Sequence, residues 1–110
     1  MKHNGELLIL TTMAEAERAA AFARGLVEAR LAACVSVLPG ATSFYRWKSE
    51  TISEDREIVL LIKTHRQKLS EVEAYFREQH PYECPEFVVL DAAMSEGHGG
   101  WLRGELRIEG

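Results

Sequence analysis

The sequence predicts one α+β domain in which two strand-helix-strand halves are joined by a long hairpin. Short apolar runs of strand length alternate with two longer segments that have helical periodicity. A polar turn at Lys48-Ser49-Glu50 separates two strand-like runs in the middle of the chain. Because 110 residues suffice for a single hydrophobic core, we treat residues 1–110 as one domain.

The first half begins with the apolar run Leu7 to Thr12, which is hydrophobic on both faces. Such a strand is typically covered on its two sides or packed in an oligomer. Thr12 and Glu15 have the spacing of a capping box, in which each side chain accepts from the other residue's amide. We therefore expect a helix from Ala14 to Leu31, with one apolar face against the sheet.

The middle of the chain predicts an extended hairpin. Residues 33–47 alternate with β-branched and aromatic side chains, interrupted at Pro39-Gly40, which favours a long strand bent by a bulge. After the polar turn, Arg56 to Lys63 returns as an apolar strand. The tip of this hairpin should project beyond the domain.

The second half repeats the strand-to-helix pattern. Thr64 and Gln67 again have capping-box spacing, and apolar residues continue at helical intervals until His80-Pro81. Phe87 to Leu90 supplies a fourth strand, and Trp101 to Ile108 predicts a short C-terminal helix.

This element order, β-α-β-β-α-β followed by a helix, is that of a ferredoxin-like split β-α-β sandwich, in which both helices lie on the same face of the sheet. The strands are apolar on both sides, so the other face would be a hydrophobic surface exposed to water, and such surfaces associate. We therefore expect a homo-oligomer.

Composition excludes several classes of partner. The net charge is −4, with basic residues scattered among acidic ones, so no basic stripe predicts nucleic-acid binding. The apolar run Leu7 to Leu10 is too short for a signal-peptide core or a membrane span. These features predict a cytoplasmic protein without membrane contacts, in which Cys34 and Cys84 remain free thiols.

Three segments carry a resemblance to a known family. Leu31 to Trp47, Ile62 to Thr64 and His80 to Glu86 resemble, nearly residue for residue, the signature of the CutA family of divalent-cation tolerance proteins. The resemblance implies a homotrimer of ferredoxin-like subunits. It also implies a role in tolerance to copper and other divalent metals, which is not tied to one clear reaction.

Metal-binding candidates are a thiol on a strand and a cluster at a helix end. Cys34 could be a thiolate ligand for Cu(I), or a small buried hydrophobic residue. His80, Glu83 and Cys84 fall within one turn and could form a mixed cluster, although His80 could equally interact with the helix carbonyls as a capping group. The predicted cofactor is accordingly copper or another divalent metal.

His3 is a separate metal-binding candidate at the N-terminus. A free amine, two amides and an imidazole at the third position can surround Cu(II) in square-planar geometry. The alternative is an untethered tail, as domain ends commonly are.

Aromatic and basic residues near the hairpin tip predict either interface packing or a ligand cleft. In the second case Arg46, Trp47, Lys63 and Tyr82 would line a cleft between subunits that takes a small anion.

No glycine-rich phosphate loop and no nucleophile-base-acid set is recognisable, so we expect no catalytic residue, no enzyme and no organic cofactor. The leading function is a trimeric metal-tolerance protein that binds copper; the alternatives are a signalling trimer that binds a small anion, or a protein-interaction scaffold.

Overall fold

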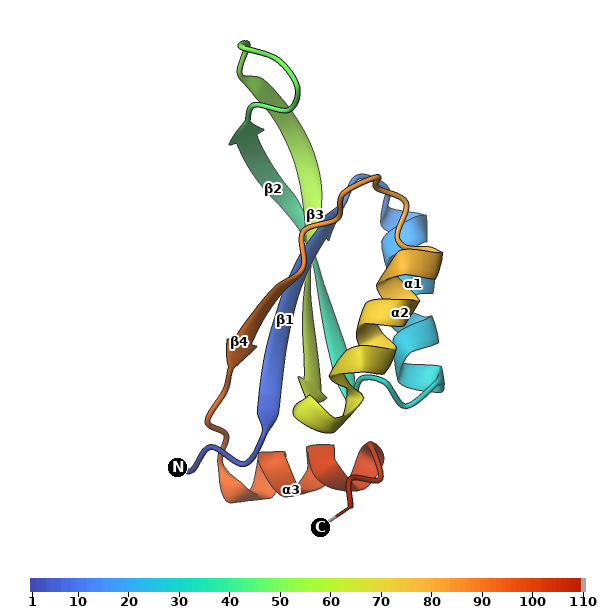
Figure 1. The fold of residues 1–110 in the computed structure, drawn as a ribbon, viewed down its shortest axis with the longest axis vertical. Coiled ribbons are helices and arrows are strands. Elements are labelled where there is room, and N and C mark those ends of the chain that lie inside the picture. The colour runs from blue at the N-terminus through green and yellow to red at the C-terminus, as the bar shows by residue number, and fades with distance from the viewer. Residues whose placement is uncertain (110) are drawn as a thin grey trace.

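The structure is a computed structural model that describes residues 1–109. It confirms the predicted order of elements (Figure 1). These elements are β1 (Glu6–Met13), α1 (Ala16–Glu28), β2 (Cys34–Tyr45), β3 (Ser53–His65), the short 3₁₀ helix η1 (Arg66–Lys68), α2 (Leu69–Gln79), β4 (Val88–Asp91) and α3 (Glu96–Glu105).

The four strands form one antiparallel sheet in the order β2-β3-β1-β4. Helices α1 and α2 lie side by side against one face of this sheet, and α3 lies across its lower end (Figure 1). This is the ferredoxin-like arrangement that the sequence predicts. Within the described residues, no helix has both the length and the apolar character needed to cross a membrane.

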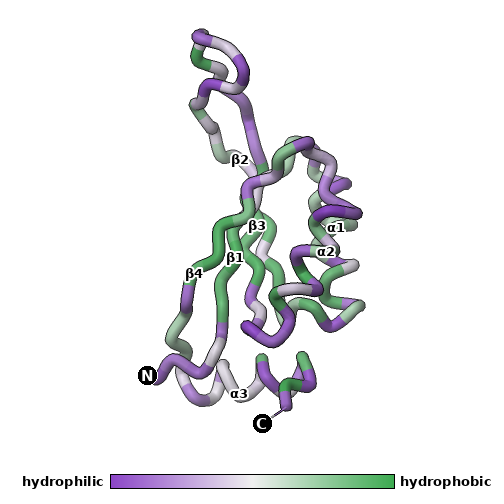
Figure 2. The backbone as a smooth tube through the Cα atoms, viewed as in Figure 1, coloured by the Kyte–Doolittle hydropathy of each residue, from purple (hydrophilic) through white to green (hydrophobic). Residues whose placement is uncertain are grey.

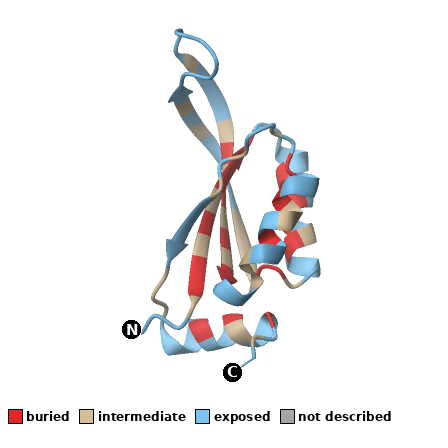
Figure 3. Cartoon of the chain, in the orientation of Figure 1, coloured by how far each residue is buried: buried red, intermediate tan, exposed pale blue. Residues whose placement is uncertain are grey.

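The hydrophobic core lies between the sheet and the two helices. Ile9, Leu60 and Ile62 of the central strands are completely buried, and they pack in one cluster with Leu26 of α1 and Phe76 of α2. Figure 3 shows the corresponding buried stripes on β1, β3 and the inner sides of the helices. Burying one such side chain contributes about 1.5–3 kcal/mol, so this cluster makes a large favourable contribution to folding.

The opposite face of the sheet is apolar but open, and we call it the open face. Residues paired across strands share a face, so the register places Leu10 of β1 beside Leu61 of β3 and Val88 of β4. Leu38, Val88 and Leu90 keep 44%, 42% and 47% of their surface exposed. Figure 2 shows that hydrophobic residues predominate along β1, β3 and β4.

The hairpin of β2 and β3 extends well past the end of β1, as predicted. The pairing register shifts between Leu38 and Ala41, where Gly40 has a φ of 92°, a conformation that glycine adopts without steric cost. The predicted bulge is therefore confirmed. Beyond it, the outer hairpin gives the molecule its long dimension of 48 Å, against 26 Å and 23 Å in the other directions.

The predicted capping box before α1 is wrong. Thr12 belongs to β1 and pairs with Val59, because the ladder with β3 continues to Met13. The helix begins at Ala16 instead of Ala14, and its N-cap Glu15 makes no side-chain capping bond. It also ends earlier than predicted, at Glu28.

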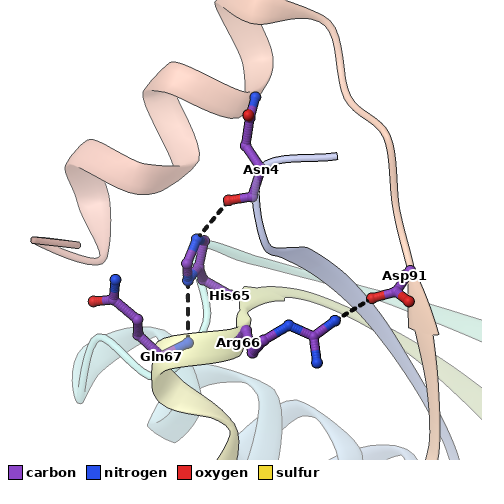
Figure 4. A network of polar contacts seen from close by, with 5 residues as sticks. All are labelled: Asn4, His65, Arg66, Gln67 and Asp91. Carbon is purple, nitrogen blue, oxygen red and sulfur yellow. Dashed lines mark hydrogen bonds and ion pairs between the residues drawn. The ribbon is translucent and has the colours of Figure 1, made fainter. Parts of the chain in front are cut away.

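The predicted capping box before α2 is also wrong. Thr64 is a buried residue of β3, and its hydroxyl donates to the carbonyl of Leu31 at 2.6 Å. His65 is the N-cap of η1, which precedes α2: its Nδ1 accepts from the amide of Gln67 at 3.1 Å, and its Nε2 donates to the carbonyl of Asn4 at 2.9 Å (Figure 4). The side chain of His65 thus joins the helix start to the segment before β1.

Helix α3 begins five residues before the predicted Trp101, at Glu96, because Ser95 provides an N-cap that accepts from the amide of His98 at 3.4 Å. The helix is held to β1 by an ion pair between Arg103 Nη1 and Oε1 of Glu6 at 2.9 Å. Glu6 is 1% exposed. A Cβ at Gly99 would lie only 2.7 Å from Oε1 of Glu6, so a side chain at this position would require the Glu6 carboxylate to shift.

Candidate functional site

A cavity of about 940 Å³ lies between the outer hairpin and the segment 81–86 that leads from α2 to β4. We call it the hairpin cleft. Its carboxylates are those of Asp55, Glu57, Glu83 and Glu86, and its aromatic residues are Phe44, Tyr45, Trp47 and Tyr82. Because β3 supplies one wall and the loop after α2 supplies the other, the cleft depends on the overall fold.

Two tyrosines donate to carboxylates of β3 inside the cleft. Tyr82 donates its hydroxyl to Glu57 Oε2 at 2.7 Å, and Tyr45 donates to Asp55. Burial, reinforced by the bond to Glu57, raises the pKa of Tyr82. The hydrogen bond to Asp55 is the main cause that raises the pKa of Tyr45. Both phenols therefore stay protonated at neutral pH and hold the carboxylates in place.

His80 positions the loop that forms the second wall. The ring is 8% exposed; its Nε2 donates to the carbonyl of Thr12 at 3.1 Å and lies 3.0 Å from Oγ1 of Thr11. Nδ1 accepts from the amide of Tyr82 at 3.2 Å. Burial lowers the pKa of His80, so the ring is neutral at pH 7. A metal ion at either nitrogen would have to replace one of these hydrogen bonds.

The predicted cleft residues divide into two groups. Trp47 and Tyr82 line the hairpin cleft. Arg46 lies at the hairpin tip and donates through Nε to the carbonyl of Glu50 at 3.0 Å. Lys63 lies on the open face, where its Nζ is 2.5 Å from Oγ of Ser36. A single chain therefore does not bring Lys63 to Tyr82.

The predicted metal ligands are also separated. Cys34 is half-buried at the start of β2 and lies 3.7 Å from Nζ of Lys63, whereas Glu83 and Cys84 are exposed in the cleft. His3 is exposed, next to an isolated β-bridge between Lys2 and Met94. Within residues 1–109, no group of three or more His, Cys, Asp or Glu side chains is arranged to hold a metal ion.

Sequence reasoning missed the two carboxylates of β3 that face the cleft. Asp55 and Glu57 are two residues apart and so lie on the same face of the strand. The spacing of two residues between these carboxylates was the feature of the sequence from which a shared face could have been predicted. It was not recognised because β3 begins at Ser53, three residues earlier than the predicted strand, so Asp55 fell outside the expected element.

Comparisons with known proteins agree with this architecture. Residues 7–105 match the model of the family described as CutA1 divalent ion tolerance protein. A divalent-cation tolerance protein CutA of Thermus thermophilus is 43% identical over 99 residues, which are 89% of this chain and 95% of that protein.

Two solved structures show the same fold at different levels of identity. The structure of CutA from Synechococcus elongatus has a TM-score of 0.91 and 36% identity, covering 96% of this chain and 94% of that one. The structure titled periplasmic divalent cation tolerance protein CutA from Archaeoglobus fulgidus has a TM-score of 0.86 and 26% identity, covering 92% and 98%. With the family model matching most of its length, this chain belongs to the CutA1 family of divalent ion tolerance proteins.

Proposed function

We propose that this protein acts in tolerance to divalent metal ions as a cytoplasmic homotrimer that binds copper and catalyses no reaction. The observation that carries the proposal is the position of Cys34, a soft ligand, on the apolar open face that other copies of the chain would cover. The two free thiols are typical of a reducing compartment.

Assembly is supported by the composition of the open face. Leucine and valine side chains from all four strands lie there, and several remain more than 40% exposed. Contiguous apolar patches on soluble proteins commonly mark interaction surfaces. The likeness to the family supplies the number of three subunits.

Copper binding between subunits is supported by the distribution of ligand-type side chains. The described residues of one chain hold no group of three His, Cys, Asp or Glu side chains that could hold a metal ion, so a site built from such side chains would draw on more than one chain. Cys34 is the candidate at the interface, because thiolates are preferred ligands of Cu(I). The segment with His80, Glu83 and Cys84 is a second location, and His3 is a third.

Sedimentation equilibrium and Cu(I) titration test this function. We expect a species of three times the 12.4 kDa chain mass. Cys34→Ser should weaken Cu(I) binding, while the trimer stays assembled. Cys84→Ser is the matched variant, since it removes the other thiol from an exposed loop. A monodisperse monomer, or unchanged Cu(I) affinity in both variants, would contradict the proposal.

The alternative of a signalling trimer that binds a small anion is less favoured by the cleft. Its lining contains four carboxylates, and Arg56 is the basic residue among the lining side chains. Like charges disfavour an anion there, so a neighbouring subunit would have to supply the missing cations. The scaffold hypothesis remains open, with the exposed Phe44 and Trp47 at the hairpin as its contact residues.

A further inference from the structure

The hairpin cleft combines negative charge with aromatic walls. Four carboxylates and four aromatic residues line it, with Arg56 as the basic residue among them. Organic ammonium groups are recognised by this combination, because carboxylates attract the charge and aromatic faces attract it through their quadrupoles. The cleft is therefore suited to an organic cation.

The carboxylates are distributed along the cleft instead of converging on one point. Asp55 and Glu57 lie on β3, where each already accepts from a tyrosine, whereas Glu83 and Glu86 lie on the opposite loop. In the part of the chain that the structure describes, they do not form a group that could hold one metal ion. Separated negative charges suit an extended ligand with separated positive charges.

The protein's own Lys48 shows how an ammonium group fits at the rim of the cleft. Its Nζ lies 3.2 Å and 3.4 Å from the two carboxylate oxygens of Glu83 and 5.4 Å from the centroid of the Trp47 ring. Trp47 belongs to the hairpin tip and Glu83 to the facing loop. An ammonium group thus joins the two walls through an aromatic ring and a carboxylate.

We propose that the hairpin cleft binds a small diamine or polyamine. One ammonium group of the ligand replaces Nζ of Lys48 between Trp47 and Glu83, and another lies toward the carboxylates of β3. Lys48 then acts as an internal competitor for the ligand. This site shares Glu83 with the second candidate location for copper, but it does not include Cys34, on which the proposed copper binding rests.

Isothermal titration calorimetry at low salt tests the site on the full-length protein, with putrescine as the probe and butylamine as the singly charged control. Putrescine should bind several-fold more tightly than butylamine. Glu83→Gln should weaken binding about threefold, and Lys48→Gln should strengthen it about two- to fivefold, the range that exposed ion pairs imply. Lys68→Gln, which removes the same charge on η1 outside the cleft, should leave the affinity nearly unchanged.

The opposite signs of the Glu83 and Lys48 effects separate the proposal from general charge attraction. If Lys68→Gln strengthens binding as much as Lys48→Gln does, or if butylamine binds as tightly as putrescine, the proposal is wrong. Absence of putrescine binding in both the parent protein and Lys48→Gln would also overturn it. Both substituted side chains are exposed, and an unchanged denaturation curve will show that each variant is folded.

Discussion

The two faces of the sheet have similar sequences but different surroundings. On the face covered by α1 and α2, Leu7, Ile9 and Leu60 are completely buried. On the open face, their neighbours Leu8 and Leu61 remain partly exposed. In the middle of β1 and β3, residues on both faces are thus apolar, yet the chain provides cover for only one set. This difference is the basis for the proposed assembly through the open face.

The largest effect is expected on the covered face. Leu60→Ala should lower the free energy of unfolding by about 2–5 kcal/mol, because it leaves a cavity in a fully packed core. Leu61→Ala is the matched control, with the same side chain on the open face one residue later. Urea denaturation measures both, and a cost below about 1 kcal/mol at Leu60 would contradict the burial described for this face.

The next effect concerns assembly through the open face. Val59 is paired with Leu38 on that face, so Val59→Asp would place a carboxylate in the proposed subunit interface, where an unpaired charge is strongly unfavourable. The variant should sediment as a monomer while its circular dichroism stays that of the folded chain. Retention of the trimer would show that the open face is not the interface.

A smaller effect concerns pH and the covered face, where His80 lies. Burial lowers its pKa below the ordinary value of 6.5, so the unfolded chain binds the proton more tightly than the folded chain does. Stability should therefore fall as the pH drops below about 6.5 toward the lower pKa of the folded state. Urea midpoints between pH 7.5 and 5 measure this slope, which should flatten in His80→Asn. If the stability of His80→Asn depends on pH as steeply as that of the parent protein, groups other than His80 cause the dependence.

The smallest effect is expected at the edge of the sheet, outside both faces. Arg66 pairs with Asp91 of β4 (Figure 4), and the two side chains are 60% and 66% exposed. Exposed ion pairs contribute about 0–1 kcal/mol, so Arg66→Ala should shift the urea midpoint only slightly, and less still in high salt. A loss comparable to that of Leu60→Ala would contradict this ranking.

The sequence predicted the order of elements because apolar periodicity reports which residues a sheet or helix buries. It failed at the helix starts, where Thr12 and Thr64 have capping spacing but remain in strands. The ladder between β1 and β3 continues through both residues, and this long-range pairing outweighs a local pattern.

The site was predictable only in part, for a related reason. Trp47 and Tyr82 were correctly predicted as candidates for a cleft, but Lys63 was grouped with them although its side chain points to the open face. Which side chains meet depends on strand register and on the path of the 81–86 loop. Neither is encoded in the spacing of residues along the chain.

The contact between Gly99 and Glu6 restricts how this protein can change during evolution. A side chain at position 99 would collide with the glutamate that holds Arg103 of α3. Replacing Glu6 alone would leave the guanidinium of Arg103 without its carboxylate partner. A larger residue at position 99 would therefore displace the carboxylate of Glu6 from Arg103, so that substitutions at these three positions should affect one another.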